Sequence, residues 1–525
     1  MAILDTITHS DVADRHRPWP RAQVDDEGWR QAIDQLASGR LVLLGLWGDV
    51  PMVHMALLDE PAGEAAVISY VCKSGKYPSV GARHAPAIRL ERAMNDLFGL
   101  EAVNAPDTRP WLDLGFWDVR HPLGKKAAAR RQVPYDFLPA EGEGLHQIPV
   151  GPVHAGIIEP GHFRFTANGE HVVRLEQRLG WVHKGIESLM QGAKLEQAAR
   201  LAARTSGDST VAYAFAFAQA AEAAMQIKAP LRASYLRALM AELERLANHF
   251  GDIGAICNDA SFALMQAQCA ILRERTLRAA EAGFGHRLMM DVIVPGGLSR
   301  DIAPKGLAEA AVLVAAVRGV FADLIELYDN TASLQDRTVT TGIVKPELAA
   351  QFGAGGYVGR ASGRTFDARR ALAYAPYDKL SFEVPVRDEG DVNARVWLRI
   401  REVEQSLSLI EQILGAVPAG AIKAPLGRAK SCEGLGFAEA FRGDVLVWLR
   451  INGNSRVARC HLRDASWFQW PLLEAAIEGN IVADFPLCNT SFNCSYSGHD
   501  LYDAQDPVRR DCPGIADRAS AGGGR

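Results

Sequence analysis

The sequence lacks any pair of cysteines separated by two residues, although it contains eight cysteines among 525 residues. Thiolate metal and cluster sites commonly use such close pairs, so their absence argues against a resident zinc or iron–sulfur site. The N-terminus also shows no basic start followed by an apolar run, so no signal peptide is expected. We therefore expect the scattered cysteines to be reduced and mostly buried, and we expect this chain to bind no metal.

Long uninterrupted hydrophobic runs and an excess of basic charge are absent as well. The most apolar stretch, 310–327, carries Arg318, Asp323 and Glu326 at helical spacing, which is typical of a core helix and not of a membrane span. The formal net charge is −5, which gives no electrostatic reason to expect a nucleic-acid partner. Any attachment to a membrane is therefore expected to go through a partner protein.

The composition, with 48% hydrophobic and 23% charged residues, is that of a globular protein, and the length predicts two or three domains. Near the N-terminus, short apolar runs bounded by turn residues predict strands at 41–47, 52–58 and 65–71. A helix is predicted over 86–98, with Gly99 at its C-cap. We interpret residues 1–145 as a small α+β domain that ends in a solvated linker.

The second part of the chain reads as mainly helical, with small peripheral sheets. Helical periodicity predicts helices at 231–250, 307–334 and 396–414. The dipeptides Asn168-Gly169 and Asn452-Gly453 predict two hairpin turns. The expected fold class is α+β: a small N-terminal α+β domain fused to a mainly helical domain over 146–514. A disordered tail is expected over 515–525 because its sequence is small and glycine-rich.

Two stretches carry ordered motifs of known families. The first resembles the small hydrophilic subunit of respiratory complex I over roughly residues 40–125. Its motifs are Tyr77-Pro78-Ser79-Val80, Glu91-Arg92, Asp96-Leu97-Phe98-Gly99 and Trp117-Asp118-Val119-Arg120-His121-Pro122-Leu123.

The rest, about 148–500, resembles the large subunit of complex I and of membrane-bound NiFe hydrogenases. Its motifs are Gly151-Pro152-Val153-His154, Glu159-Pro160-Gly161-His162-Phe163, His183-Lys184-Gly185-Ile186-Glu187, 242–249, Asp336-Arg337-Thr338 and Arg360-Ala361-Ser362-Gly363. Fusion of the two subunits is typical of the formate hydrogenlyase and energy-converting hydrogenase branch. The resemblance makes His154 and Glu159 candidate catalytic residues.

The resemblance also locates the four cysteines that would hold a NiFe centre, and the sequence has none of them. Ser206 and Ser209 stand in the first pair of positions, and Ser495 and Gly498 stand in the second. A serine hydroxyl is much less acidic than a thiol and is a harder donor, so it does not replace a metal thiolate. The chemistry of a NiFe hydrogenase is therefore not expected, although its fold is.

The quinone-binding residues of complex I are also incomplete by this comparison. The tyrosine aligns near Ala203, the histidine has no clear counterpart around 155–158, and the cluster-side histidine falls near Met289. Arg200 matches the arginine that faces the iron–sulfur cluster. The sequence thus follows the hydrogenase branch. It lacks the metal-binding cysteines of the hydrogenases and part of the quinone-binding residues of complex I.

What replaces the metal is a group of polar residues: Arg204, Ser206, Asp208, Ser209, Ser495, His499 and Asp500. We expect Arg204 to be the buried partner of Asp208, which would keep the carboxylate charged. Three interpretations are open: a hydrogen-bonded network that only fills space, a proton-transfer or small-molecule site, or an oxygen-ligated cation.

The resemblance implies an oxidoreductase subunit of a membrane-associated complex related to complex I and hydrogenase-4, linked to NADH or formate and to a quinone-type acceptor. A small partner would carry a [4Fe–4S] cluster, with antiporter-like membrane subunits beneath and the chain peripheral on the cytoplasmic side of the inner membrane. NAD(H) or quinone would act at the level of the complex. The alternative is a redox-silent subunit that couples another enzyme to those membrane subunits.

Overall fold

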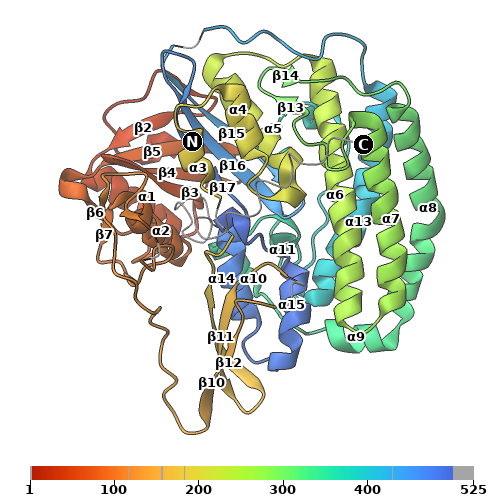
Figure 1. The fold of residues 1–525 in the computed structure, drawn as a ribbon, viewed down its shortest axis with the longest axis horizontal. Helices are drawn as coiled ribbons and strands as arrows, with labels where there is room; N and C mark the ends of the chain where they lie inside the picture. Colours follow the sequence, from red (N-terminus) through yellow and green to blue (C-terminus); the bar gives the residue numbers. More distant parts are fainter. Residues whose placement is uncertain (1–2, 116, 155–157, 183, 429, 500–525) are drawn as a thin grey trace, which may run out of the picture.

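The computed structural model describes residues 3–115, 117–154, 158–182, 184–428 and 430–499. Two four-stranded sheets lie beside a bundle of long helices, and a three-stranded arm projects from the body (Figure 1). The candidate site lies where the helices, the second sheet and the last part of the described chain meet.

The N-terminal sheet has the strand order β2-β5-β4-β3. Its strands are β2 (Arg21–Val24), β3 (Val42–Asp49), β4 (Met52–Asp59) and β5 (Glu64–Val71), which confirms the three strands predicted here. Helices α1 (Asp26–Ala37) and α2 (Ile88–Phe98) share one hydrophobic core with this sheet. Gly99 ends α2 in the left-handed conformation with φ 71°, as its position predicted.

The second sheet is internal. It contains β1 (His16–Arg17), β15 (Cys432–Ala440), β16 (Gly443–Ile451) and β17 (Val457–Arg463) in the order β1-β15-β16-β17. One face packs on the N-terminal sheet, where the rings of Trp47 and Trp448 lie 5.7 Å apart. Helix α5 (Thr210–Met225) packs on the same sheet from the large domain. The α+β class is confirmed, but this sheet lies inside the molecule and not at its periphery.

Four long helices form the bundle on the right of Figure 1. They are α6 (Leu231–Asp259), α7 (Ala263–Phe284), α8 (Gly306–Asn330) and α13 (Val392–Ala416). The helices predicted from periodicity are present. The helix predicted over 307–334 differs, because the chain leaves helical geometry at Thr331 and continues as α9 (Ala332–Thr338).

The projecting arm consists of β10 (Leu145–Val150), β11 (His162–Asn168) and β12 (His171–Arg178). Gly169 turns between β11 and β12 with φ 57°, as predicted from Asn168-Gly169. The remaining short helices are α3 (Ile186–Met190), α4 (Leu195–Ala202), α10 (Pro346–Gln351), α11 (Gly356–Arg360), α12 (Ala368–Ala371), α14 (Ser466–Ala476) and α15 (Phe485–Phe492). The remaining short strands are β6 (Lys76–Pro78), β7 (Glu101–Val103), β8 (Val119–Arg120), β9 (Ala127–Ala128), β13 (Ile293–Val294) and β14 (Gly297–Leu298).

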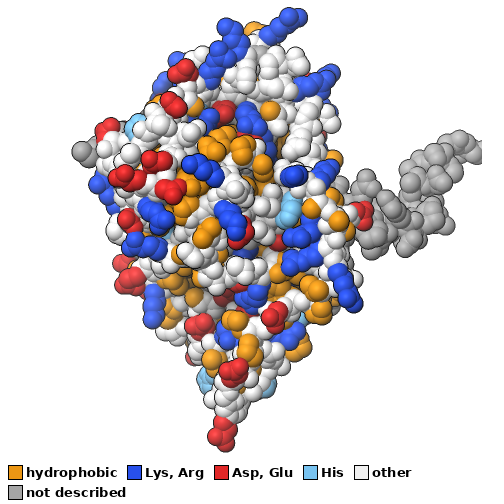
Figure 2. Space-filling model, turned by 90° about the vertical axis from the view of Figure 1, so that its left-hand side faces the viewer, with side chains coloured by type: hydrophobic (Ala, Val, Ile, Leu, Met, Phe, Trp, Pro, Cys, Tyr) orange, Lys and Arg blue, Asp and Glu red, His pale blue; other side chains and the backbone are white. Residues whose placement is uncertain are grey.

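The predicted domain boundaries stay predictions, and the predicted tail 515–525 lies outside the described residues. Among the described helices, none combines the length and the apolar character that crossing a bilayer requires. On the face shown in Figure 2, Lys and Arg side chains are interspersed with Asp and Glu. That face therefore carries no large field of one sign.

Candidate functional site

The two segments expected to supply metal ligands meet in the folded chain. Ser206 precedes the turn η4 (Gly207–Ser209), Ser209 ends it just before α5, and Ser495 follows α15. The Oγ atoms of Ser206 and Ser495 lie 3.0 Å apart and share a hydrogen bond. Residues separated by 289 positions in the sequence thus form one site.

The residues present do not fit a NiFe centre. Ser206 and Ser495 bond directly to each other, and the backbone N–H of Gly498 donates to Ser495 Oγ at 3.0 Å. A Cβ atom at Gly498 would lie 2.9 Å from the Cβ of Asp464, so a longer side chain is excluded without rearrangement. The donors are hydroxyl groups, which are poor ligands for these metals.

The side chains of this site are also not arranged to bind an oxygen-ligated cation. No cluster of three or more His, Cys, Asp or Glu side chains suited to a metal occurs in the described part of the chain. The carboxylate of Asp208 is instead occupied by a guanidinium group.

Asp208 is the charged centre of the site, and its partner is Arg442. Nη1 of Arg442 donates to Asp208 Oδ1 at 2.8 Å, and Nη2 donates to Oδ2, which makes a bidentate pair. Ser206 Oγ donates to Asp208 Oδ1 at 2.8 Å, and Ser209 Oγ adds a longer bond at 3.4 Å. Burial alone would raise the pKa of Asp208, but Arg442 and the two hydroxyls hold that pKa below its ordinary value. The carboxylate is therefore charged at neutral pH.

The prediction that Arg204 pairs with Asp208 is wrong. Arg204 makes a bidentate pair with Asp291 at 2.8 and 3.0 Å, and both side chains are about one-third exposed. Helix α4 ends at Ala202, and Arg204 follows it on the solvent side, whereas Asp208 lies beyond the turn at Ser206. Proximity in the sequence therefore suggested the wrong arginine as the ion-pair partner of Asp208.

Further polar residues connected to Arg442 could not be predicted from the sequence. Nε of Arg442 donates to the carbonyl of Asn493, whose side chain donates to Asp252 at 2.8 Å. Asp252 is paired with the buried Arg399 at 3.0 Å. No sequence signal pointed to Arg442, because it lies 234 residues from Asp208 in a turn between two strands.

Glu159, predicted from the resemblance, lies within electrostatic range of the site. Burial raises the pKa of its carboxyl, the negative charge of Asp208 raises it further, and Lys184 and Arg442 oppose these effects. Glu159 is nevertheless accessible to solvent. It is thus a second carboxyl group near Asp208, in a more exposed setting.

His154 and Arg200 are not linked to Asp208 by any hydrogen bond or ion pair among the described residues. The ring Nε2 of His154 lies 2.7 Å from the carbonyl of Gly161, which fixes the loop before β11. Arg200 lies exposed in the last turn of α4. The predicted site residues His499 and Asp500 lie outside the residues whose side chains are described.

The two nearby cysteines are buried thiols. Cys488 lies on α15 and Cys494 follows it, and both side chains are almost inaccessible. Burial raises the pKa of Cys488 to about 11 and raises that of Cys494 as well. Both are therefore neutral near pH 7 and unsuited to act as thiolate ligands.

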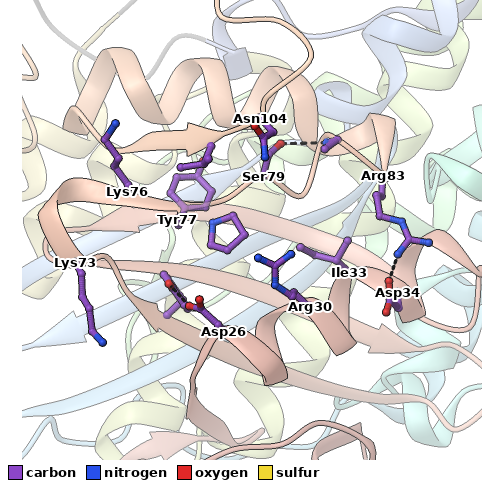
Figure 3. Close-up of a pocket in the computed structure, with 14 residues that line it drawn as sticks. Asp26, Arg30, Ile33, Asp34, Lys73, Lys76, Tyr77, Ser79, Arg83 and Asn104 are labelled. Carbon is purple, nitrogen blue, oxygen red and sulfur yellow. Dashed lines mark hydrogen bonds and ion pairs between the residues drawn. The ribbon is translucent and has the colours of Figure 1, made fainter.

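Away from these residues, a hollow with a volume of about 460 Å³ lies in the N-terminal part beside α1 (Figure 3). Within it Arg83 forms an ion pair with Asp34, and the hydroxyl of Tyr70 donates to Asp26. Arg30, Lys73 and Lys76 line this hollow as well. Because none of the predicted site residues is in its lining, we place the candidate site at Asp208.

Comparisons with known proteins agree with the family resemblance of the sequence motifs. Residues 260–433 match the family model described as respiratory-chain NADH dehydrogenase, 49 Kd subunit. Formate hydrogenlyase subunit 5 of Escherichia coli K12 is 32% identical over 434 residues, covering 80% of this chain and 76% of the relative. Hydrogenase-4 component G of the same organism is 30% identical over 448 residues, covering 83% and 78%.

A solved structure is also similar. It is a chain of the membrane-bound sulfane sulfur reductase, described as an archaeal respiratory membrane complex. The TM-score is 0.65 at 25% identity, and the match covers 68% of this chain and 99% of the other. The chain therefore belongs to the family of oxidoreductase large subunits that includes formate hydrogenlyase subunit 5, hydrogenase-4 component G and their counterpart in NADH-quinone oxidoreductase.

Proposed function

We propose that this chain is a catalytic-type subunit of a membrane-associated oxidoreductase complex that works without a NiFe centre. Family membership supports the complex, and the Ser206–Ser495 contact in place of thiolate ligands supports the absence of the metal. The structural relative named as a sulfane sulfur reductase supports a substrate other than hydrogen for this scaffold. The proposed electron acceptor is a quinone or another small electron carrier. The proposed electron donor to the complex is NADH or formate.

The complex would contain partners that this chain does not replace. A small subunit with a [4Fe–4S] cluster would dock near the exposed Arg200. Antiporter-like membrane subunits would anchor the complex, and this chain would lie peripherally on the cytoplasmic side of the inner membrane. Names of relatives such as the membrane-bound hydrogenase of Pyrococcus furiosus support this arrangement.

Asp208 carries the proposed chemistry within this chain. Its carboxylate stands between the two former ligand positions Ser206 and Ser209, and 35% of its side chain is accessible. A charged and partly accessible carboxylate held by a guanidinium group can orient a small polar ligand or exchange a proton with it. Glu159 would provide a second carboxyl group of different pKa.

Asp208→Asn tests this role, because it keeps the volume and removes the charge. We expect NADH- or formate-dependent quinone reduction to fall tenfold or more, about 1.4 kcal/mol in the barrier, while the complex still assembles. Ser209→Ala is the matched control, since it removes only long bonds to Asp208 (3.4 Å) and Arg442 (3.3 Å) and leaves the charge pair in place. Full activity in an assembled Asp208→Asn complex would remove Asp208 from the mechanism.

The alternative is a redox-silent coupling subunit, and one observation favours it. Both oxygens of Asp208 accept bonds from Arg442, so the pair resembles a closed structural network. In that case Asp208→Asn would leave activity unchanged, or would reduce activity and assembly together because Arg442 loses its partner. Measuring turnover per assembled complex separates the two roles.

A further inference from the structure

A small cavity lies against Asp208 on the side of the helix bundle. Its volume is about 160 Å³, and it lies between α6 and α7. The lining residues are Gly207, Asp208, Leu243, Glu244, Ala247, Asn248, Arg273, Thr276, Leu277, Ala280, Arg287, Leu288 and Met289. Three serines of the former ligand positions, Ser206, Ser209 and Ser495, are buried outside this lining. Asp208 lines the cavity, whereas these serines do not.

Polar residues from η4, α6 and α7 line the cavity. Glu244 and Asn248 lie one helical turn apart on α6, and the Asn248 amide donates to the Asp208 carbonyl at 2.8 Å. Arg273 and Arg287 are exposed at the outer side. A volume of about 160 Å³ admits several water molecules. Asp208, Glu244 and Asn248 offer them polar contacts in a wall that is otherwise mainly apolar.

We propose that this cavity is a water-filled proton route between solvent at α7 and the Asp208 carboxylate, with Glu244 as the proton-holding group along it. The proposal rests on the proposed function of Asp208 as a proton-exchanging group. Asp208 is ionised at rest, so the water chain delivers a proton to its carboxylate when the site consumes one, and solvent at the outer side resupplies that proton.

The surroundings of Glu244 hold its two protonation states close in free energy. Its Oε2 accepts the N–H of Val211 at 2.7 Å and its Oε1 accepts that of Ala212 at 3.1 Å, which favours the carboxylate. Burial, followed by the negative charge of Asp208, raises the pKa of Glu244 to about 8, whereas Arg245 lowers it. The charged groups lining the cavity from the other elements are Asp208 from η4, Arg273 from α7 and Arg287 from the loop after α7.

Thiol labelling tests whether solvent reaches the cavity. Thr276→Cys places a thiol in the cavity wall at a position that is fully buried, where the native hydroxyl bonds the Leu272 carbonyl. We expect a small cationic methanethiosulfonate reagent to modify it in the full-length protein. Thr338→Cys is the matched control, because Thr338 is equally buried and bonds the Leu334 carbonyl in the same way, but does not line the cavity. The same reagent on the unsubstituted protein gives the background.

Hydrogen–deuterium exchange of the Glu244 carboxylic acid tests the proton route itself. Its C=O infrared band is identified by its loss in Glu244→Gln. Ala280→Leu adds bulk to the wall, and we expect it to slow both exchange of the band and labelling at Thr276→Cys tenfold or more. Equal rates with and without Ala280→Leu, or labelling no faster than at Thr338→Cys, would overturn the proposal.

These readouts do not depend on turnover. A complex that lacks oxidoreductase activity but shows fast exchange and labelling would refute the proposed function and keep the route. An active complex with slow exchange would support the proposed function and refute the proton route. If Glu244→Gln fails to assemble, the labelling comparison decides solvent access without it.

Discussion

At the scale of single residues, the site replaces an arrangement of thiolates and metal ions by one compensated charge pair. Four thiolates would carry a large negative charge that only metal ions could balance. Here the single negative charge of Asp208 is balanced by the guanidinium of Arg442 and by hydroxyl donors. The pocket is therefore electrostatically complete without a metal.

The ion pairs of Arg442 and Arg204 predict that the two arginines contribute unequally to the free energy of unfolding. Arg442→Ala leaves the Asp208 charge without its partner, and we expect the free energy of unfolding to fall by about 2–3 kcal/mol, less than for a fully buried pair because solvent reaches Asp208. Arg204→Ala breaks a pair with Asp291 whose side chains are about one-third exposed, and we expect a loss of about 1 kcal/mol or less. Urea denaturation of the purified chain measures both. Equal losses would contradict the assignment of Arg442 as the partner.

A second residue-scale prediction concerns pH and Glu91. Burial raises the pKa of Glu91 to about 7, although Ser79 Oγ and the Val80 N–H each donate to it at 2.7 Å. The folded state therefore binds this proton more tightly than the unfolded state, and the stabilisation is lost as pH rises from about 4.5 to 7.

Glu91→Gln removes that titration. We expect the fall in unfolding free energy between pH 5 and pH 7.5 to shrink by on the order of 2 kcal/mol. Chemical denaturation at both pH values measures this change. An identical pH dependence in the native protein and the variant would show that Glu91 is already ionised at pH 5.

Among the helices and strands, sequence periodicity predicted those whose apolar pattern is set by neighbouring residues in the chain. Strands β3, β4 and β5 and helices α6 and α13 appear close to their predicted positions because their apolar spacing depends on nearby residues alone. Strand β15 was not predicted, because Gly434 and Gly436 interrupt its apolar pattern. The ion pair of Asp208 with Arg442 was also beyond prediction, since tertiary folding alone brings these residues together.

The glycines of β15 have a packing role that can be tested. A Cβ atom at Gly434 would lie 1.9 Å from the Ala220 carbonyl oxygen on α5. We expect Gly434→Ala to cost about 2–3 kcal/mol, because helix and sheet must separate. Gly453→Ala is the control, since a Cβ there meets nothing within 4 Å, and we expect a change within about 0.5 kcal/mol. Comparable thermal unfolding of the two variants would refute the close approach of α5.

At the scale of the whole molecule, the fold and the chemistry of this family separate. The sequence motifs identified the family correctly, because many residues of the scaffold are kept in order along the chain. The same scaffold here encloses hydroxyls and an ion pair where the hydrogenase branch would hold metal. The order of motifs could reveal the missing ligands but not the arginine that compensates for them.

Elemental analysis of the purified intact complex tests whether this oxidoreductase-type subunit works without a NiFe centre. We predict nickel at background level in preparations that are active in quinone reduction, with iron explained by clusters in partner subunits. Stoichiometric nickel that co-purifies with this chain would show that the subunit holds a nickel centre after all.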